Sequence, residues 1–253
     1  MIYRFSGGSD GSHPRSGVVR DSQGNLYGTT GAGGQFSEGV VYKVTPGGQE
    51  TVLHSFNNAD GSDPDTTLVL DPQGNLYGTT RYGGITISFG TVFKVTTGGA
   101  FNSLYKFSSA LDGQNPTGAL IRDSQGNLYG TTESGGSKGG GMVYKLSPSG
   151  TESILYNFTG GVDGGMPEGG LVRDGAGNLY GTTISGGNTN CAPSCGVVYK
   201  VTPAGQEQVL YSFDTFTGAA PNSGLTPDGK GGAYGTTTHG GANFAGTVYQ
   251  VGP

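Results

Sequence analysis

The chain has 253 residues, which is enough for one large all-β domain or two small ones. Charged residues make up only 12% of it, and the formal net charge of -5 argues against nucleic acid or an anionic membrane as a partner. No stretch approaches the ~20 apolar residues of a membrane helix, which argues against insertion into a membrane.

One heptapeptide, Gly-Asn-Leu-Tyr-Gly-Thr-Thr, recurs along the chain. It begins at Gly24, Gly74, Gly126 and Gly177, and it returns altered as Gly-Gly-Ala-Tyr-Gly-Thr-Thr at residues 231–237. Its tyrosines stand at positions 27, 77, 129, 180 and 234, so the steps between them are 50, 52, 51 and 54 residues. A period near fifty with four strand-like segments in each unit is typical of a β-propeller.

The four segments of the first unit span residues 17–21, 25–30, 39–45 and 50–56, and we call them A, B, C and D. β-Branched and aromatic residues dominate them, turn residues separate them, and no window has helical periodicity. By analogy with other propellers, A is expected innermost and D outermost. Because a single unit cannot bury its own apolar face, residues 1–253 are predicted to form one five-bladed propeller with four antiparallel strands in each blade. The blades are expected at about 17–56, 67–107, 118–158 and 170–213, with the fifth at 224–251 plus 1–5.

The two ends of the chain explain that last assignment. Residues 2–5, Ile-Tyr-Arg-Phe, match the D segments at 104–107 and 155–158, whereas the chain ends on a C segment at 246–251. The N-terminal strand is therefore predicted to supply the missing outermost strand of the last blade, which would close the ring and cover a sheet edge. Residues 1–5 are then not a signal peptide, and if the natural protein is exported this sequence lacks its leader.

Turn lengths distinguish the two ends of each blade. The A-to-B and C-to-D turns are short, whereas the B-to-C and D-to-A loops are long, variable and expected at one end, which we call the top face. Function is expected there, because binding and catalytic residues concentrate on irregular loops. The glycine inside segment B is predicted to let an aromatic side chain from a neighbouring sheet approach closely. The candidates are the C-segment residues Tyr42, Phe93, Tyr144, Tyr199 and Tyr249.

Several recurrent charged residues have a structural interpretation. The A-to-B turns each carry an aspartate that is interpreted as a turn former. The D-to-A loops carry Asp-Gly pairs, for which a turn role is favoured over ligand pockets like those of five-bladed lectins. Arginines recur on segment A and are expected to pair with repeat aspartates, with anion binding as the alternative. These residues are Asp21, Asp71, Asp123, Asp174 and Asp228; Asp10, Asp60, Asp112 and Asp163; and Arg20, Arg122 and Arg173, whose place Leu70 and Pro227 take elsewhere.

The heptapeptide, the Gly-Gly pairs and the Gly-Thr/Val-Val-Tyr/Phe-Lys-Val elements resemble the Gloeo/Verruco tandem repeat family over essentially the whole chain. The fifth unit departs from the pattern at Gly232-Ala233, where Asn-Leu is expected. The resemblance implies a bacterial, exported and often surface-anchored propeller-like protein. It implies no established activity and no catalytic residues.

The positions at which the repeats differ are the candidate site. A proline precedes each A segment, and the residue after it is expected at the mouth of the central channel: Arg15, Asp65, Thr117, Glu168 and Asn222. A second ring, after the Thr-Thr pairs, contains Arg81, Tyr82, Glu133 and His239. Paired carboxylates roughly 5–10 Å apart perform glycosidic acid/base chemistry, so Asp65, Glu133 and Glu168 are the catalytic candidates if the protein is an enzyme. The alternative is that they are solvated loop acids. The binding candidates are Arg15, Arg81, Tyr82, Asn222, His239 and His13.

Histidine and cysteine give little support for a metal. His13 and His239 are expected at the seam between blades five and one, but two histidines without a third ligand are poor evidence for a metal site. His54 is interpreted as a packing residue. Cys191 and Cys195, separated by Ala-Pro-Ser, favour a small disulfide loop, with free thiols or a metal as alternatives, and a disulfide indicates an oxidising compartment.

The sequence therefore predicts an extracellular or cell-surface binding module, expected to be a monomer without a cofactor, whose top-face loops bind carbohydrate or a cell-surface glycan. The absence of tryptophan counts against sugar binding, because aromatic platforms are its usual tool. A glycoside hydrolase or polysaccharide lyase is one alternative, and a purely structural repeat is the other.

Overall fold

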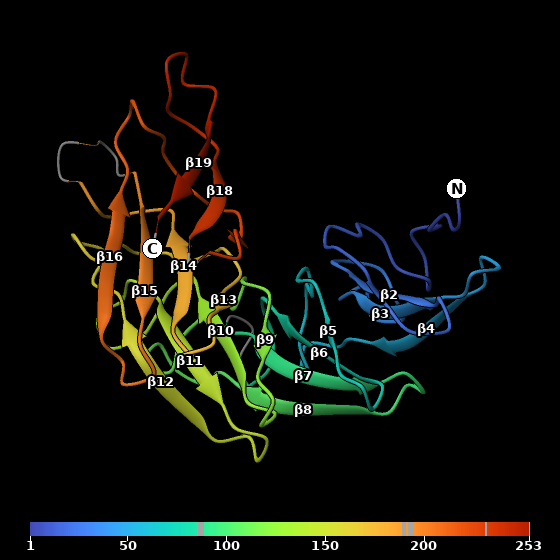
Figure 1. Ribbon diagram of the computed structural model, residues 1–253. Helices are drawn as coiled ribbons and strands as arrows, with labels where there is room; N and C mark the ends of the chain where they lie inside the picture. Colours follow the sequence, from blue (N-terminus) through green and yellow to red (C-terminus); the bar gives the residue numbers. More distant parts are fainter. Residues whose placement is uncertain (86–88, 189–190, 192–194, 231, 253) are drawn as a thin grey trace. The chain divides into compact units, whose positions relative to one another are not determined.

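The structure of the protein is a computed structural model that describes residues 1–85, 89–188, 191, 195–230 and 232–252. Within these ranges the regular elements are all β-strands, connected by turns and isolated bridges (Figure 1). None of the described residues belongs to a helix long and apolar enough to cross a membrane. The described part of the chain is thus all-β, as the repeat pattern predicts.

The strands of the described residues form five antiparallel sheets, four of four strands and one of three, and strand order follows chain order in each. The first sheet contains β1 (Val19–Arg20), β2 (Leu26–Thr30), β3 (Val40–Val44) and β4 (Glu50–Ser55). The second contains β5 (Val69–Leu70), β6 (Asn75–Thr80), β7 (Thr91–Thr96) and β8 (Phe101–Lys106). The third contains β9 (Ile121–Arg122), β10 (Leu128–Thr132), β11 (Met142–Leu146) and β12 (Glu152–Asn157). The fourth contains β13 (Val172–Arg173), β14 (Leu179–Thr183), β15 (Val197–Val201) and β16 (Glu207–Ser212), and the fifth contains β17 (Thr226–Pro227), β18 (Ala233–Thr237) and β19 (Thr247–Val251).

The predicted B, C and D segments within the repeats coincide with these strands, but residues 2–5, predicted as a D strand, form none, and segment A is much shorter than expected. Of residues 17–21 only Val19 and Arg20 form a strand. One reason is that the backbone N–H of Gly17 donates to the side-chain hydroxyl of Thr67, 3.1 Å away, instead of to a neighbouring strand. Five sheets fit the five predicted blades.

By contacts the chain divides into two compact units. The first consists of residues 1–108 and 115–122, and the second of residues 109–114 and 123–253. The first contains the sheets β1–β4 and β5–β8, and the second contains the sheets β13–β16 and β17–β19. Each unit is described by itself.

Within each unit, neighbouring sheets pack through one aromatic contact that repeats. Phe56, which follows β4, meets Phe93 of β7 edge-on, with ring centroids 5.0 Å apart. In the second unit Phe213 meets Tyr249 in the same way at 4.8 Å. Phe5, near the N-terminus, meets Tyr42 of β3 at 4.9 Å. The N-terminal residues thus pack against the first sheet as the last strand of a preceding sheet would.

The polar residues of the heptapeptide form the A-to-B turn. The carboxylate of Asp21 accepts hydrogen bonds from the backbone N–H and side-chain amide of Asn25, both at 2.8 Å, and from the hydroxyl of Tyr27 at 2.9 Å. The same three donors recur around Asp71, Asp123 and Asp174. These contacts confirm that the aspartates are turn formers, and they explain why Asp, Asn and Tyr recur together.

The glycine inside the heptapeptide has a packing role, but the predicted source of the aromatic ring is wrong. Gly28 is the cross-strand partner of Tyr42 in the same sheet. A β-carbon on Gly28 would lie 2.5 Å from the Tyr42 hydroxyl oxygen. The ring therefore comes from the adjacent strand and not from a neighbouring sheet, because directly opposed residues in an antiparallel pair point to the same face.

Candidate functional site

An unusual backbone conformation recurs in the D-to-A loops. One proline precedes each A segment, and the residue before that proline has a positive φ although it is not glycine. The values are 57° at His13, 52° at Asp63, 56° at Asn115, 56° at Met166 and 53° at Ala220. Residues with a β-carbon seldom adopt a positive φ, and Asn, Asp and His do so more often than the others. Backbone hydrogen bonds hold the conformation, as the Asp63 N–H donates to Glu38 and the Asp63 carbonyl accepts from Arg81, both at 3.1 Å. The loops that carry the candidate residues are therefore fixed by their backbone.

The first unit brings together a group of polar residues that we call the top-face cluster: Arg15, Asp63, Asp65, Arg81 and Tyr82. Arg15 Nη1 lies 3.6 Å from Asp63 Oδ1. The guanidinium of Arg81 lies over the Tyr82 ring, 5.5 Å from its centroid. Four of these five residues were predicted as site residues; Asp63 was not, and its place before a proline in the same loop was the available signal.

Asp65 is the half-buried carboxyl of the cluster. Burial, and then the negative charge of Asp63, raises the pKa of Asp65, while the positive charges of Arg81 and Arg15 act in the opposite direction. The loop of the next repeat also reaches this group, because the side-chain amide of Asn115 donates to the Arg81 carbonyl at 3.2 Å. The cluster thus combines a carboxyl that protonates more readily than usual with two guanidinium groups and an aromatic ring.

Four of the remaining predicted site residues lie in the second unit. Glu133 and Glu168 are half-buried, and Asn222 and His239 are exposed. His239 Nδ1 is 3.0 Å from the Thr238 hydroxyl. The predicted approach of Asp65 to the two glutamates stays a prediction. So does a meeting of His239 with His13, an exposed residue of the first unit whose Nδ1 is 3.2 Å from the Ser12 hydroxyl.

The Asp-Gly aspartates of the D-to-A loops bind their own loops. Asp10 accepts from the Tyr3 hydroxyl at 2.8 Å and from the Ser6 N–H and hydroxyl at 2.7 Å each. Asp163, 8% exposed, accepts in the same way from Tyr156 and Thr159. The turn role favoured from the sequence is confirmed, and these carboxylates are engaged within the loop rather than presented to a ligand.

The remaining sequence expectations concern histidine and cysteine. His54 stacks on Phe101 with ring centroids 3.8 Å apart and also contacts the Asp60 carboxylate at 3.1 Å, which confirms its packing role. Cys191 and Cys195 are joined in a disulfide, with Cα atoms 5.8 Å apart. The three residues between them lie outside the described ranges. In the described part of the chain, no three or more His, Cys, Asp or Glu residues are grouped so as to hold a metal ion.

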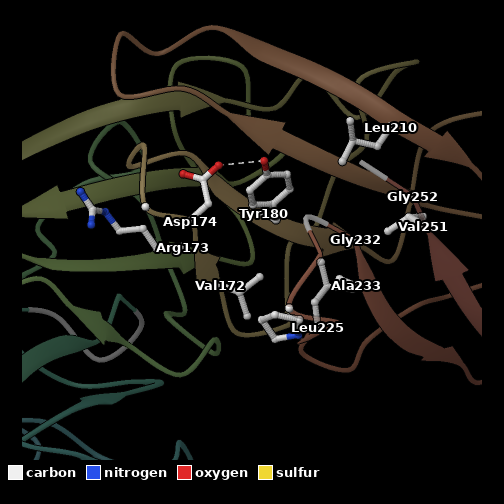
Figure 2. Close-up of a pocket in the computed structure, with 13 residues that line it drawn as sticks. Val172, Arg173, Asp174, Tyr180, Leu210, Leu225, Gly232, Ala233, Val251 and Gly252 are labelled. Carbon is white, nitrogen blue, oxygen red and sulfur yellow. Dashed lines mark hydrogen bonds between the residues drawn. The ribbon is translucent and has the colours of Figure 1, made fainter.

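A pocket of about 320 Å³ in the second unit was not predicted. It lies between the sheets β13–β16 and β17–β19, beside the A-to-B turns and not at the top face. Figure 2 shows Asp174 hydrogen-bonded to Tyr180 on one side of it, and Val172, Leu225 and Ala233 gathered on another. The available signal was the altered fifth heptapeptide, in which Gly232 and Ala233 replace Asn and Leu.

The sheets and their packing define an all-β, propeller-like repeat protein. The chain belongs to the Gloeobacter/Verrucomicrobia repeat family, whose model matches residues 1–192. No curated protein matches the chain.

Solved structures share the fold at low identity. A gluconolactonase from Xanthomonas campestris is 14% identical with a TM-score of 0.57, over 94% of this chain and 71% of that one. PorZ, a surface component of the type-IX secretion system of Porphyromonas gingivalis, is 15% identical with a TM-score of 0.55, over 97% of this chain and 33% of that one. The extracellular domain of a one-component system from B. thetaiotaomicron is 13% identical with a TM-score of 0.54, over 93% and 27%. At these identities the similarity shows the fold alone.

Proposed function

We propose that the protein is an exported binding module that takes carbohydrate at the top-face cluster. Export is supported by two structural neighbours, whose names describe an extracellular domain and a bacterial surface component. The disulfide between Cys191 and Cys195 suits the same conclusion, because disulfides persist in oxidising compartments.

The observation that carries the carbohydrate proposal is the composition of the top-face cluster. Asp65, Arg15 and Arg81 offer charged acceptors and donors, which suit the neighbouring hydroxyl groups of a sugar ring. Tyr82 is 37% exposed beside Arg81 and offers an aromatic face for the C–H groups of a pyranose. A few convergent polar groups beside an aromatic surface are the usual composition of a small-molecule site.

The test is a glycan array followed by titration of any glycan that binds. Asp65→Asn and Tyr82→Ala are each expected to weaken binding by about tenfold or more, as expected for central contact residues. Lys138→Ala removes an exposed charge from another top-face loop and is expected to leave affinity unchanged. Failure to bind across the array, or binding that survives both cluster variants, would refute the proposal.

A polysaccharide hydrolase or lyase is the second candidate, and the raised pKa of Asp65 favours it. A carboxyl that keeps its proton to higher pH can act as the general acid in glycosidic cleavage. Release of reducing ends from a polysaccharide panel, stopped by Asp65→Asn and by Glu168→Gln, would support the enzyme. Saturable glycan binding without any released product would support the binding module and not the enzyme.

We further propose that residues 1–5 close a single five-bladed ring by pairing with β19. Phe5 already packs on Tyr42 as Phe56 packs on Phe93. The fifth sheet has three strands, and Val248 of β19 is 80% exposed, whereas Val41, Val92, Val143 and Val198 at the equivalent place are fully buried. A strand added at β19 would complete the sheet in the pattern of the others.

A further inference from the structure

The tyrosine of the heptapeptide is a binding surface for cations inside this protein. Tyr77 has Lys94 of its own sheet 6.0 Å from its ring centroid and the Arg122 guanidinium 5.6 Å from it. Tyr129 repeats the arrangement, with Lys145 at 6.0 Å and the Arg173 guanidinium at 5.7 Å. In both cases the arginine comes from segment A of the following repeat, and aromatic faces attract such cations.

The arginine also meets the turn aspartate that holds the tyrosine. Arg122 Nη2 lies 3.9 Å from Asp71 Oδ2, and that oxygen accepts the Tyr77 hydroxyl at 3.0 Å. The aromatic face and the carboxylate therefore act together on one guanidinium. Within the protein, this Tyr-Asp pair therefore binds a guanidinium group.

At Tyr180 this arginine is missing. The equivalent segment A residue is Pro227, and its cross-strand partner is Ala233, where the fourth sheet pairs Arg173 with Leu179. Both departures from the repeat are thus reductions in size at adjacent positions on one face of the fifth sheet. The pocket of about 320 Å³ lies at this place and is lined by Tyr180, Asp174, Pro227 and Ala233 among others.

The pocket has an anionic end and an apolar wall. The Tyr180 hydroxyl donates to Asp174 Oδ2 at 3.0 Å (Figure 2). Burial opposes the ionised form, but hydrogen bonds from Asn178 and Tyr180 outweigh it and lower the pKa of Asp174, so the carboxylate is charged at neutral pH. Val172, Leu225 and Ala233 form the wall (Figure 2). The guanidinium of Arg173, which also lines the pocket, is engaged with Tyr129.

We propose that this pocket binds a guanidinium group on an aliphatic stem, with the guanidinium against the Tyr180 ring and the Asp174 carboxylate and the stem along Val172, Leu225 and Ala233. The ligand takes the place that Arg122 and Arg173 fill at the other seams. Tyr27 also lacks a following arginine, because Leu70 stands there. At Tyr27, Lys43 already lies over the ring, 5.9 Å from its centroid, and Leu70 lines the adjoining pocket. Arg173 of the Tyr180 pocket is engaged with Tyr129 instead, so we assign the guanidinium site to Tyr180.

Two kinds of ligand carry a guanidinium group on an aliphatic stem: a free guanidino compound and an arginine side chain of a peptide. Calorimetric titration with agmatine represents the first and with N-acetyl-L-arginine amide the second. We expect at least one of them to bind with one site per chain, and the tighter of the two identifies the source. The matched urea, N-acetyl-L-citrulline amide, keeps the shape without the charge and is expected to bind at least about tenfold more weakly than the arginine amide.

Two variants restore the residues of the repeat and refill the pocket. Pro227→Arg supplies the missing guanidinium, and Ala233→Leu supplies the missing side-chain volume. Each is expected to weaken binding of the guanidino probe by about tenfold or more. Thr226→Arg adds the same charge one residue away, on the opposite face of β17, and is expected to leave binding unchanged.

Three outcomes would overturn the proposal. They are the absence of saturable binding by both guanidino probes, equal binding of the citrulline and arginine amides, and binding that neither Pro227→Arg nor Ala233→Leu weakens. Because both variants introduce the residue that other repeats carry, loss of binding is checked against an unchanged or raised melting temperature.

Discussion

The ring of Tyr42 lies directly against Gly28, its cross-strand partner, so that a β-carbon on Gly28 would stand 2.5 Å from the Tyr42 hydroxyl oxygen. Tyr42 is 5% exposed and on its other side meets Phe5. The glycine of the heptapeptide therefore admits an aromatic side chain that joins two layers of the packing.

Gly28→Ala is expected to lower the melting temperature by several degrees. Overfilling a packed core costs about 1–3 kcal/mol, and the tyrosine ring cannot move away from a neighbour on its own sheet. Gly47→Ala is the control, because its β-carbon would meet only the Thr45 hydroxyl at 3.8 Å. A thermal melt of the two variants checks the prediction, and equal melting temperatures for them would contradict it.

Ala233→Leu is expected to stabilise the protein. Leu76, Leu128 and Leu179 occupy the same place in other repeats and are at most 2% exposed, and Ala233 borders the pocket of about 320 Å³. Filling a cavity adds about 0.5–2 kcal/mol, which raises the melting temperature of a domain of this size by about 1–8 °C. Calorimetry provides the measurement. A lowered melting temperature would mean that the pocket cannot accommodate leucine.

Glu207→Gln is expected to change how stability depends on pH. Burial, and then the charge of Asp163, raises the pKa of Glu207 to about 7, and Glu207 Oε1 is buried with no hydrogen-bond partner among the described residues. The folded state therefore holds this proton more tightly than the unfolded chain. The resulting stabilisation is present below the ordinary pKa of about 4.5 and is lost as pH rises through about 7. The variant is expected to match the wild type at pH 4 and to melt higher at pH 8.

Asp214→Asn is the matched comparison in the same unit. Hydrogen bonds from the Thr217 backbone and hydroxyl, and from the Phe216 backbone, lower the pKa of Asp214. This contribution is present above the ordinary pKa of an aspartate and is lost as pH falls through the lowered value. Asp214→Asn is therefore expected to melt below the wild type at pH 8, with the gap narrowing in acid. Parallel trends for the two variants would contradict both assignments.

Ring closure predicts that residues 1–5 and Val248 both contribute to stability. Deleting residues 1–5 is expected to lower the melting temperature sharply, but this deletion also removes Phe5 from Tyr42. Val248→Lys separates the two effects, because Val248 is 80% exposed in the second unit, whereas its counterparts Val41 and Val198 are buried against residues of the sheet that follows. A closed ring would bury Val248 in the same way. Under closure, both variants lower the melting temperature. A Val248→Lys protein that melts like the wild type would count against closure.

The repeat alone predicted most of the secondary structure. Strands B, C and D and the turn aspartates follow from short-range chemistry, since Asp21, Asn25 and Tyr27 lie within seven residues of one another and bind each other directly. Segment A was predicted too long, because Gly17 bonds to Thr67, fifty residues away. The loop positions of Arg15, Asp65, Arg81 and Tyr82 also followed from the places where the repeats disagree.

Tertiary structure decided what the sequence left open. Only packing showed that Tyr42 covers Gly28 from its own sheet, that Asp63 joins Arg15, and that Arg122 reaches Tyr77 and Asp71 of the preceding repeat. The altered fifth heptapeptide is visible in the sequence, but whether it opens a pocket depends on the sheet that packs beside it. Removing a leucine and an arginine opens a pocket only where two sheets face each other, and the contacts that create such a place lie some fifty residues apart.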